Sequence, residues 1–219
     1  MKYFGQHSNP KVDEYLHREF FSNTKNGFFI ECGAFDGLLE SNTLFFERFM
    51  EWKGINVEPH PDLFTRLVSN RPNSINLNVA LTSPTKKGNL EFCGFDFKSR
   101  QDINLYGKYS GLGHVKVLDI KNYDQLGLKD GESRVYNVNG ITYKDLIEFN
   151  KVSSVNLFVL DAEGSEIDVI EGMIGCSILP DIMCVEYGFI GLNNLTNCLS
   201  DLGYKKYSVI HNNAHYVLK

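Results

Sequence analysis

The sequence lacks the features of a membrane protein, of a disulfide framework and of a zinc site. No stretch approaches the roughly 18 apolar residues of a membrane span, and the start MKYFGQHSNPK has no apolar signal-peptide core. The cysteines are odd in number and include no C-x-x-C pair, which favours free thiols in a reducing compartment. We therefore expect a cytoplasmic protein with five unpaired cysteines: Cys32, Cys93, Cys176, Cys184 and Cys198.

Positive charge is also scarce. Lys and Arg number 22 against 27 Asp and Glu, which gives a formal net charge of −5 with His neutral. This balance argues against nonspecific nucleic-acid binding, which needs a positive surface. The 219 residues, 42% of them hydrophobic, suffice for one domain with its own core and are too few for two. We expect a single domain over residues 1–219; the sequence leaves its oligomeric state open.

Apolar runs and turn residues alternate along the first part of the chain as strand, helix, strand, helix, strand. Gly54 is expected to end the first of these helices as its C-terminal cap. This β-α-β-α-β order implies parallel strands joined by right-handed crossovers. The expected strands are Phe28–Cys32, Ile55–Glu58 and Ser74–Leu81, and the expected helices are Asn42–Lys53 and one that begins at Pro61.

The same alternation resumes after residue 139 and ends in a β-hairpin. The expected fold is therefore α/β and Rossmann-like: a mostly parallel sheet with helices on both faces and an antiparallel C-terminal strand. The elements expected here are helices at Thr142–Phe149, Glu166–Ile174 and Leu192–Leu202, strands at Val155–Leu160 and Asp181–Tyr187, and hairpin strands at Tyr204–Ile210 and Ala214–Leu218.

Two segments lie outside this alternation. Residues 1–26 are polar and aromatic, and we expect them to form an N-terminal cap segment with a short helix at Val12–Phe21. Residues 84–139 are rich in Gly, Lys, Asp and Tyr and interrupt the rhythm between the third and fourth core strands. Because segments of this length in a compact domain are usually functional, we expect this insertion to form part of the substrate site.

A glycine-rich turn with acidic residues follows the first strand, in the run Glu31-Cys32-Gly33-Ala34-Phe35-Asp36-Gly37. In open α/β sheets, ligands bind at the carboxyl ends of the strands, above such a turn. The turn is not G-x-G-x-x-G, because Phe35 replaces the middle glycine, and its acids would repel a diphosphate. S-adenosylmethionine carries an ammonium, a sulfonium and no phosphate. It therefore fits the turn better than a nicotinamide dinucleotide.

A second acid ends the second strand. Glu58 is placed to accept hydrogen bonds from two ribose hydroxyls of a nucleoside-containing cofactor. Asn78 or Ala80, at the end of the third strand, would then lie near the adenine. Each feature alone is common in proteins, and the prediction rests on their order along successive strands.

A group of carboxylates follows the later strands. Asp161 and Glu163 are two residues apart at the end of a buried strand, so their side chains start on the same side, and Glu186 ends the next strand. Clustered carboxylates raise the pKa of one another, and one of them can accept the proton of a hydroxyl acceptor. Asp161 or Glu163 ranks first as this base, and His114 of the insertion ranks second. The trio could instead hold Mg²⁺, an alternative ranked below the metal-free one.

The residues just after this pair have a structural explanation. Ser165, with Asp168 three residues later, predicts a capping-box-like start of a helix. Glu166 adds negative charge to the first helical turn, where it is favourable.

Three motifs resemble those of the FkbM-type methyltransferases. The run FIECGAFDG at residues 29–37, with ESNT at 40–43, is similar to the opening motif of that family. GINVEPHP at residues 54–61 is similar to the second motif, and LDAEGSE at residues 160–166 to the third, a D-x-E-G-x-E run. Many members carry His where this chain has Ser165. The resemblance covers about residues 27–203.

The resemblance implies a class I methyltransferase fold with S-adenosylmethionine as the methyl donor and S-adenosylhomocysteine as the product. Glu31, Gly33 and Asp36 would surround the methionine part. Residues 41–43 would hydrogen-bond its carboxylate or shape the pocket, and Glu58 would hold the ribose. The full set of expected cofactor-binding residues is Glu31, Gly33, Ala34, Asp36, Gly37, Ser41, Asn42, Thr43, Glu58, Pro59, Asn78, Ala80 and Asp161.

These observations favour an S-adenosylmethionine-dependent O-methyltransferase that acts on a hydroxyl of a sugar, a glycan or a related small molecule. The sugar part follows only from the resemblance. A nicotinamide-dependent oxidoreductase on the same fold is an alternative, against which the missing middle glycine and Glu31 count. A non-catalytic binding protein is a third hypothesis, and the intact carboxylates at positions 31, 58, 161 and 163 argue against it.

Overall fold

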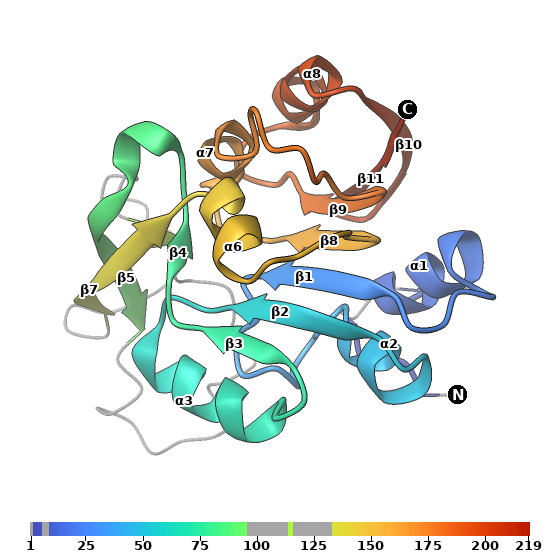
Figure 1. The fold of residues 1–219 in the computed structure, drawn as a ribbon, viewed down its shortest axis with the longest axis horizontal. Coiled ribbons are helices and arrows are strands. Elements are labelled where there is room, and N and C mark those ends of the chain that lie inside the picture. The colour runs from blue at the N-terminus through green and yellow to red at the C-terminus, as the bar shows by residue number, and fades with distance from the viewer. Residues whose placement is uncertain (1, 6–8, 96–113, 116–132) are drawn as a thin grey trace.

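A seven-stranded sheet with helices on both faces forms the centre of the protein (Figure 1), in a computed structural model that describes residues 2–5, 9–95, 114–115 and 133–219. The strand order is β10-β11-β9-β8-β1-β2-β3. The strands are β1 (Phe28–Cys32), β2 (Lys53–Val57), β3 (Ile75–Leu77), β8 (Leu157–Leu160), β9 (Ile182–Glu186), β10 (Tyr204–Ile210) and β11 (Asn213–Leu218).

Five neighbouring strands of this sheet are parallel, and the C-terminal hairpin completes it. β1 pairs with β2 on one side and β8 on the other, and β3 and β9 extend the parallel part outward. β11 is inserted between β9 and β10 and runs antiparallel to both. The expected α/β architecture, with its antiparallel C-terminal strand, is confirmed.

Helices cover both faces because the central strands are apolar on both sides. Ile30 and Cys32 of β1 face the core under α6, α7 and α8, whereas Phe29 faces the core under α1 and α2. Burying an aliphatic or aromatic side chain of this kind contributes about 1.5–3 kcal/mol. The helices are α1 (Val12–Phe20), α2 (Leu44–Phe49), α3 (Pro61–Asn70), α6 (Tyr143–Phe149), α7 (Glu166–Glu171) and α8 (Leu192–Asp201).

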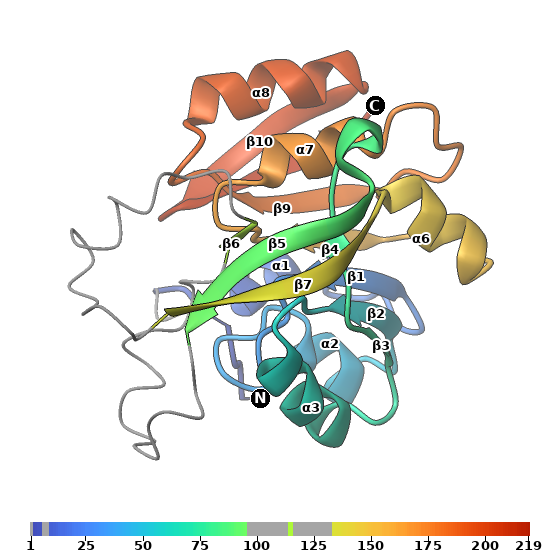
Figure 2. The same ribbon diagram turned by 90° about the vertical axis from the view of Figure 1, so that its left-hand side faces the viewer.

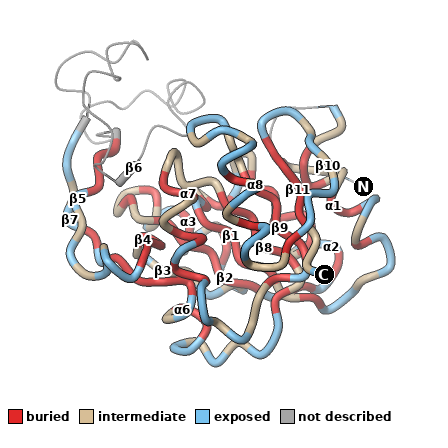
Figure 3. The backbone as a smooth tube through the Cα atoms, turned by 90° about the horizontal axis from the view of Figure 1, so that it is seen from above, coloured by how far each residue is buried: buried red, intermediate tan, exposed pale blue. Residues whose placement is uncertain are grey.

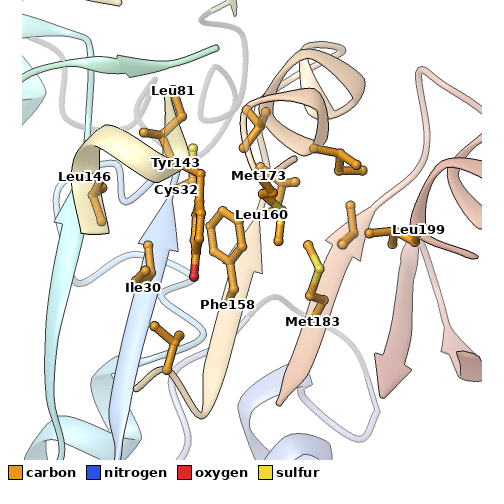
Figure 4. Packing of buried hydrophobic residues seen from close by; sticks show 14 of the residues in the cluster. Ile30, Cys32, Leu81, Tyr143, Leu146, Phe158, Leu160, Met173, Met183 and Leu199 are labelled. Atoms are coloured by element: carbon orange, nitrogen blue, oxygen red, sulfur yellow. The ribbon is translucent and has the colours of Figure 1, made fainter. Parts of the chain in front are cut away.

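The larger core lies between α6, α7 and the middle of the sheet (Figure 4). The rings of Tyr143 and Phe158 lie 5.4 Å apart at its centre, and Met173, Met183 and Leu160 fill the space toward α8. Figure 3 shows the same arrangement as burial: the central strands are buried and the outer loops are exposed. This packed centre fixes the ends of β1, β2, β8 and β9 relative to one another.

A second sheet stands beside the carboxyl ends of the central strands (Figures 1 and 2). Its order is β4-β7-β5-β6, and β5 and β7 form an antiparallel ladder. The ring of His60, just after β2, lies 4.7 Å from the ring of Tyr136 on β7. The elements are β4 (Ala80–Leu81), the 3-10 helix η1 (Pro84–Lys86), β5 (Gly88–Phe95), β6 (His114–Val115) and β7 (Ser133–Ile141).

Two expected element boundaries are wrong. The helix expected at Asn42–Lys53 ends at Phe49, because Glu51 takes a left-handed φ of +60° that stops it; Lys53 and Gly54 belong to β2. The strand expected at Ser74–Leu81 is divided: β3 joins the large sheet, and β4 crosses to the second sheet. The insertion is therefore rooted in a sheet of its own.

The N-terminal cap segment packs beside α2 on the same face of the large sheet. Val12 and Leu16 of α1 are fully buried in the second core, and Gly5 forms a parallel bridge with Glu40. Among the described residues, none of the helices has the length and apolar character needed to cross a membrane.

Candidate active site

The turn after β1 lies at the carboxyl edge of the sheet and is tied to β2. Gly33 and Gly37 have φ values of +83° and +80°, which suit glycine. The amides of Gly33 and Ala34 donate to Val57 O at 3.0 and 3.1 Å. Phe35 also has a left-handed φ, +51°, a kind of backbone strain that gathers at functional sites. The backbone conformation and these two hydrogen bonds fix the position of this turn at the carboxyl edge of the sheet.

Gly33 leaves no room for a side chain. A Cβ at this position would lie 2.0 Å from Asp161 O, on the neighbouring strand end. We expect Gly33→Ala to lower the free energy of unfolding by about 3 kcal/mol or more, from the clash together with the φ penalty. Thermal or urea unfolding measures this. Gly175→Ala is the matched control, since Gly175 has a φ of +74° and nothing within 4 Å; equal losses for both would contradict the packing argument.

Glu58 is buried directly beneath the turn. Its carboxylate accepts hydrogen bonds from Phe35 N and His60 N, both at 2.8 Å, one on each oxygen. Burial raises the pKa of Glu58 from 4.5 to about 8, although the two amides act to lower it. Each oxygen keeps a second lone pair for a further donor. Glu58 thus connects the turn after β1 to the end of β2. Its carboxylate can also accept hydrogen bonds from hydroxyl groups of a ligand there.

The two residues expected near an adenine bind the protein itself. Asn78 Nδ2 donates to Glu58 O at 2.8 Å and to Pro59 O at 3.0 Å, so it holds the backbone that carries Glu58. Ala80 is buried in the small core of the second sheet, against Phe92. The expectation that Asn78 or Ala80 lies near the adenine stays a prediction; because the Ala80 methyl group is buried, its backbone would have to make such a contact.

Glu31 and residues 41–43 form one buried network. The carboxylate of Glu31 accepts hydrogen bonds from Ser41 Oγ at 2.9 Å, Thr43 Oγ1 at 2.7 Å and Asn42 N at 2.8 Å. A hydroxyl has a single proton, so Ser41 and Thr43 have none left for a cofactor carboxylate. Of the two roles expected for these residues, the structure favours that of shaping the pocket.

Arg71 completes this network, and the sequence analysis missed it. It follows α3 immediately, is fully buried, and forms an ion pair with Glu47 at 2.8 Å and one with Glu31 at 3.5 Å. Nothing in its local sequence distinguishes it from an ordinary arginine at a helix end. The one available signal was Glu31 itself, because a buried acid needs a partner.

Asp161, Glu163 and Glu186 meet at the ends of β8 and β9. One carboxylate oxygen from each residue lies within 4.8 Å of the others. Burial and the charges of Glu163 and Glu186 raise the pKa of Asp161 well above its ordinary value, and burial with Glu186 raises that of Glu163 to about 9. The cluster therefore retains protons at neutral pH. Three such oxygens also fit a divalent cation, for which these residues would supply the ligands.

The turn that carries these carboxylates is held from within. Buried Glu166 accepts hydrogen bonds from Ala162 N at 2.9 Å and from Gly164 N at 3.1 Å. The expected capping box at the start of α7 is wrong. Ser165, whose backbone (φ −101°, ψ 10°) is not in the extended conformation usual for an N-cap, makes no side-chain cap, and Asp168 pairs with Lys86 at 2.8 Å.

The raised pKa values predict how stability depends on pH. Between about pH 4.5 and 8, folded Glu58 keeps a proton that the unfolded chain has released, and Glu163 extends this window to about 9. The free energy of unfolding should therefore fall as pH rises through this range. We expect the melting temperature without ligand to be about 5 °C or more lower at pH 9 than at pH 6. A flat or rising melting temperature in calorimetry would contradict this prediction.

Comparison with known proteins decides the family. A family model described as the methyltransferase FkbM domain matches residues 31–206. The chain belongs to the FkbM methyltransferase domain family. No curated protein sequence matches it.

Solved structures agree with the fold of this FkbM domain. Methyltransferase FkbM from Methylobacillus flagellatus KT superposes with a TM-score of 0.53 at 13% identity, over 94% of this chain and 50% of that one. The chain thus spans half the length of that protein. Similarity extends to precorrin-6y C5,15-methyltransferase from Geobacter metallireducens GS-15 (TM-score 0.45, 10% identity, 94% and 83% covered). It also extends to Aeropyrum pernix fibrillarin, solved with natively bound S-adenosyl-L-methionine, with a TM-score of 0.46 at 11% identity, over 97% of this chain and 75% of that one.

In the FkbM domain, several of the expected site residues follow neighbouring strand ends of the large sheet, and His114 belongs to the second sheet. The Gly33–Gly37 turn, Glu58, Asp161 and Glu163 all follow neighbouring strands β1, β2 and β8. The backbone of His114 lies on β6 opposite Cys93, in the second sheet, and its side chain is outside what the structure describes. Residues 96–113 and 116–132 of the expected insertion lie outside the described residues.

Proposed function

We propose that this FkbM domain transfers a methyl group from S-adenosylmethionine to a hydroxyl of a neutral sugar, glycan or related small molecule. The observation that carries the proposal is the placement of Glu58 beneath the Gly33–Gly37 turn, at an edge where β1, β2 and β8 end together. A carboxylate there can accept both ribose hydroxyls while the turn lies beside the methionine part. Pro59 follows on the same edge.

The charge of this edge supports a cationic, phosphate-free cofactor. Glu58, Asp161, Glu163 and Glu186 follow the strand ends, and the nearby cation Lys86 is paired with Asp168. A bound ammonium or sulfonium lowers the raised pKa values of these carboxyl groups and is attracted to their ionised forms, whereas a dinucleotide diphosphate is repelled by them. The oxidoreductase alternative therefore has less support. The same argument disfavours a phosphorylated acceptor and favours a neutral one.

The proposed transfer needs no covalent bond between the protein and the methyl group. S-adenosylmethionine supplies a methyl group on a cationic sulfur, which leaves as a neutral thioether. The protein aligns the acceptor oxygen with that methyl and removes the hydroxyl proton as the C–O bond forms. Asp161 or Glu163 is the proposed proton acceptor, in its ionised form. The raised pKa values of this pair make it a stronger base than an ordinary carboxylate.

Two further points belong to the proposal. We favour a metal-free role for the trio of carboxylates, and Mg²⁺ remains the alternative that its oxygen ligands allow. The five cysteines are all free, with Cys32 and Cys184 buried in the core, which supports a reducing compartment such as the cytoplasm.

The proposal is tested first by calorimetric titration with S-adenosylhomocysteine and, separately, with NADH. Binding of S-adenosylhomocysteine alone in the micromolar range is the expected result. Binding of NADH alone would overturn the proposal, and binding of neither would favour the non-catalytic hypothesis. Transfer of labelled methyl to neutral oligosaccharides, with and without EDTA, then tests the acceptor and the metal. Loss of transfer in EDTA, restored by Mg²⁺, would replace the metal-free role.

A further inference from the structure

A single buried arginine contacts most parts of the loop between β1 and α2. Arg71 Nη1 donates to Gly37 O at 3.3 Å and to Ser41 Oγ at 3.1 Å, and Nη2 donates to Thr43 Oγ1 at 3.1 Å. Its neighbour Asn70 donates through Nδ2 to Asp36 O at 2.8 Å. The end of α3 thus holds both ends of the segment 36–43.

These contacts also fix the direction of two hydroxyl groups. Because Ser41 and Thr43 accept hydrogen bonds from Arg71, their own protons must point toward Glu31. The guanidinium therefore sets the orientation of both side chains, and Glu31 in turn receives Asn42 N. The loop is connected to Arg71 by polar groups whose donors and acceptors are matched.

Close contacts with neighbouring groups restrict the position of the Arg71 side chain. A Cβ on Gly37 would lie 2.6 Å from Arg71 Cγ, so the turn rests directly on the arginine side chain. The guanidinium lies 5.4 Å from the centre of the Phe29 ring, and its Nε donates to Glu47 at 2.8 Å. Glu47 is also bonded by Ser74. Phe29 and Glu47 thus fix the position of Arg71, and Arg71 in turn supports the turn at Gly37.

We propose that Arg71, assisted by Asn70, is a positioning residue for the cofactor: it sets the shape of the segment 33–43 without touching the cofactor. The inference rests on the proposed function, because that function places the cofactor on this segment. By this inference, the residues at the end of α3 contribute to the affinity for the cofactor, although they lie outside all three sequence motifs.

The variants must separate positioning from folding. Arg71→Met leaves Glu31 and Glu47 buried without their cation and can fail to fold. Arg71→Lys keeps the positive charge but replaces the planar guanidinium by an ammonium group. The ammonium group cannot make all the hydrogen bonds that the guanidinium donates from Nε, Nη1 and Nη2. Asn70→Ala removes a half-buried amide and leaves the charges intact. The controls are Arg66→Met, an exposed change on the same helix, and Leu199→Ala, a destabilising core change on α8.

Four quantities are measured for each variant: the dissociation constant for S-adenosylhomocysteine, the melting temperature, KM for S-adenosylmethionine, and kcat. We expect Arg71→Lys and Asn70→Ala to weaken binding and raise KM about tenfold, with kcat within about twofold, as loss of one or two hydrogen bonds predicts. Leu199→Ala should lower the melting temperature at least as much and leave the dissociation constant unchanged. Wild-type affinity in both Arg71→Lys and Asn70→Ala would overturn the proposal. A loss of affinity no greater than that of Leu199→Ala, at an equal loss of melting temperature, would overturn it as well.

Hydrogen exchange of the protein without ligand separates this inference from the proposed function. Arg71→Lys should speed exchange of the amides in segment 33–43 more than elsewhere, whichever cofactor binds. If S-adenosylhomocysteine does not bind the wild type but the exchange result holds, the proposed function fails and the positioning of the loop stands. Uniformly faster exchange across the domain would overturn the positioning role itself.

Discussion

Glu58→Ala is expected to weaken S-adenosylhomocysteine binding at least a hundredfold. Glu58 lies beneath the turn after β1, with one lone pair on each oxygen still available for a ribose hydroxyl. When the ammonium group of the bound ligand favours the ionised form of Glu58, two hydrogen bonds to this carboxylate are worth about 1.5–3 kcal/mol each, which gives a factor of about a hundred or more. Calorimetric titration at constant pH measures the change.

The control for this prediction is Glu148→Ala on α6, an exposed carboxylate remote from the strand ends. Its affinity should equal that of the wild type. Glu58→Ala also leaves Phe35 N and His60 N without their acceptor, so a modest loss of stability is expected. Glu58→Ala with unchanged affinity would show that the ribose assignment is wrong.

The second large effect concerns turnover. Glu163→Gln should lower kcat by about 10²–10⁴-fold, the usual contribution of a general base, and leave the dissociation constant for S-adenosylhomocysteine within a few fold. Asp161→Asn should lower kcat similarly, with some loss of binding, because Asp161 adjoins Gly33. Both substitutions preserve shape and remove one negative charge from the cluster, so the fold should be spared.

The pH dependence adds an independent readout. Since the pKa of Glu163 is raised to about 9 and the base acts in its ionised form, the rate of the wild type should rise with pH up to about that value. Glu163→Gln should flatten this rise. If Glu163→Gln and Asp161→Asn both keep kcat, proton removal by this cluster is disproved, and alignment alone accounts for the transfer.

Much of the framework follows from the sequence because it depends on local patterns. Apolar runs of strand length, separated by helical spacing, predict the five parallel strands, and the turn at His211 predicts the final hairpin. The meeting of Asp161 with Glu186 also follows, since adjacent parallel strands end at one edge. These are inferences about where the backbone goes.

The failures concern where side chains point. The sequence leaves two roles open for Ser41 and Thr43, binding a cofactor carboxylate or shaping the pocket, and only the hydrogen bonds that their hydroxyl groups donate to Glu31 favour the second. Ala80 follows the third strand as expected, but the chain changes sheets just before it. Arg71 stands 40 residues from Glu31 in the sequence. Hydrogen-bond partners at such separations depend on tertiary packing, which no local pattern records.

The second sheet begins and ends at a single place. Ala80 pairs with Gly140 and Leu81 with Ile141, so the chain leaves the main domain and re-enters it through two adjacent, hydrogen-bonded residue pairs. Whatever lies between these roots can change in length or shape without altering the spacing of β3 and α6. The segment is therefore exchangeable in principle. Under the proposed function, grafting the corresponding piece of another FkbM domain between residues 82 and 139 would test whether this segment selects the acceptor.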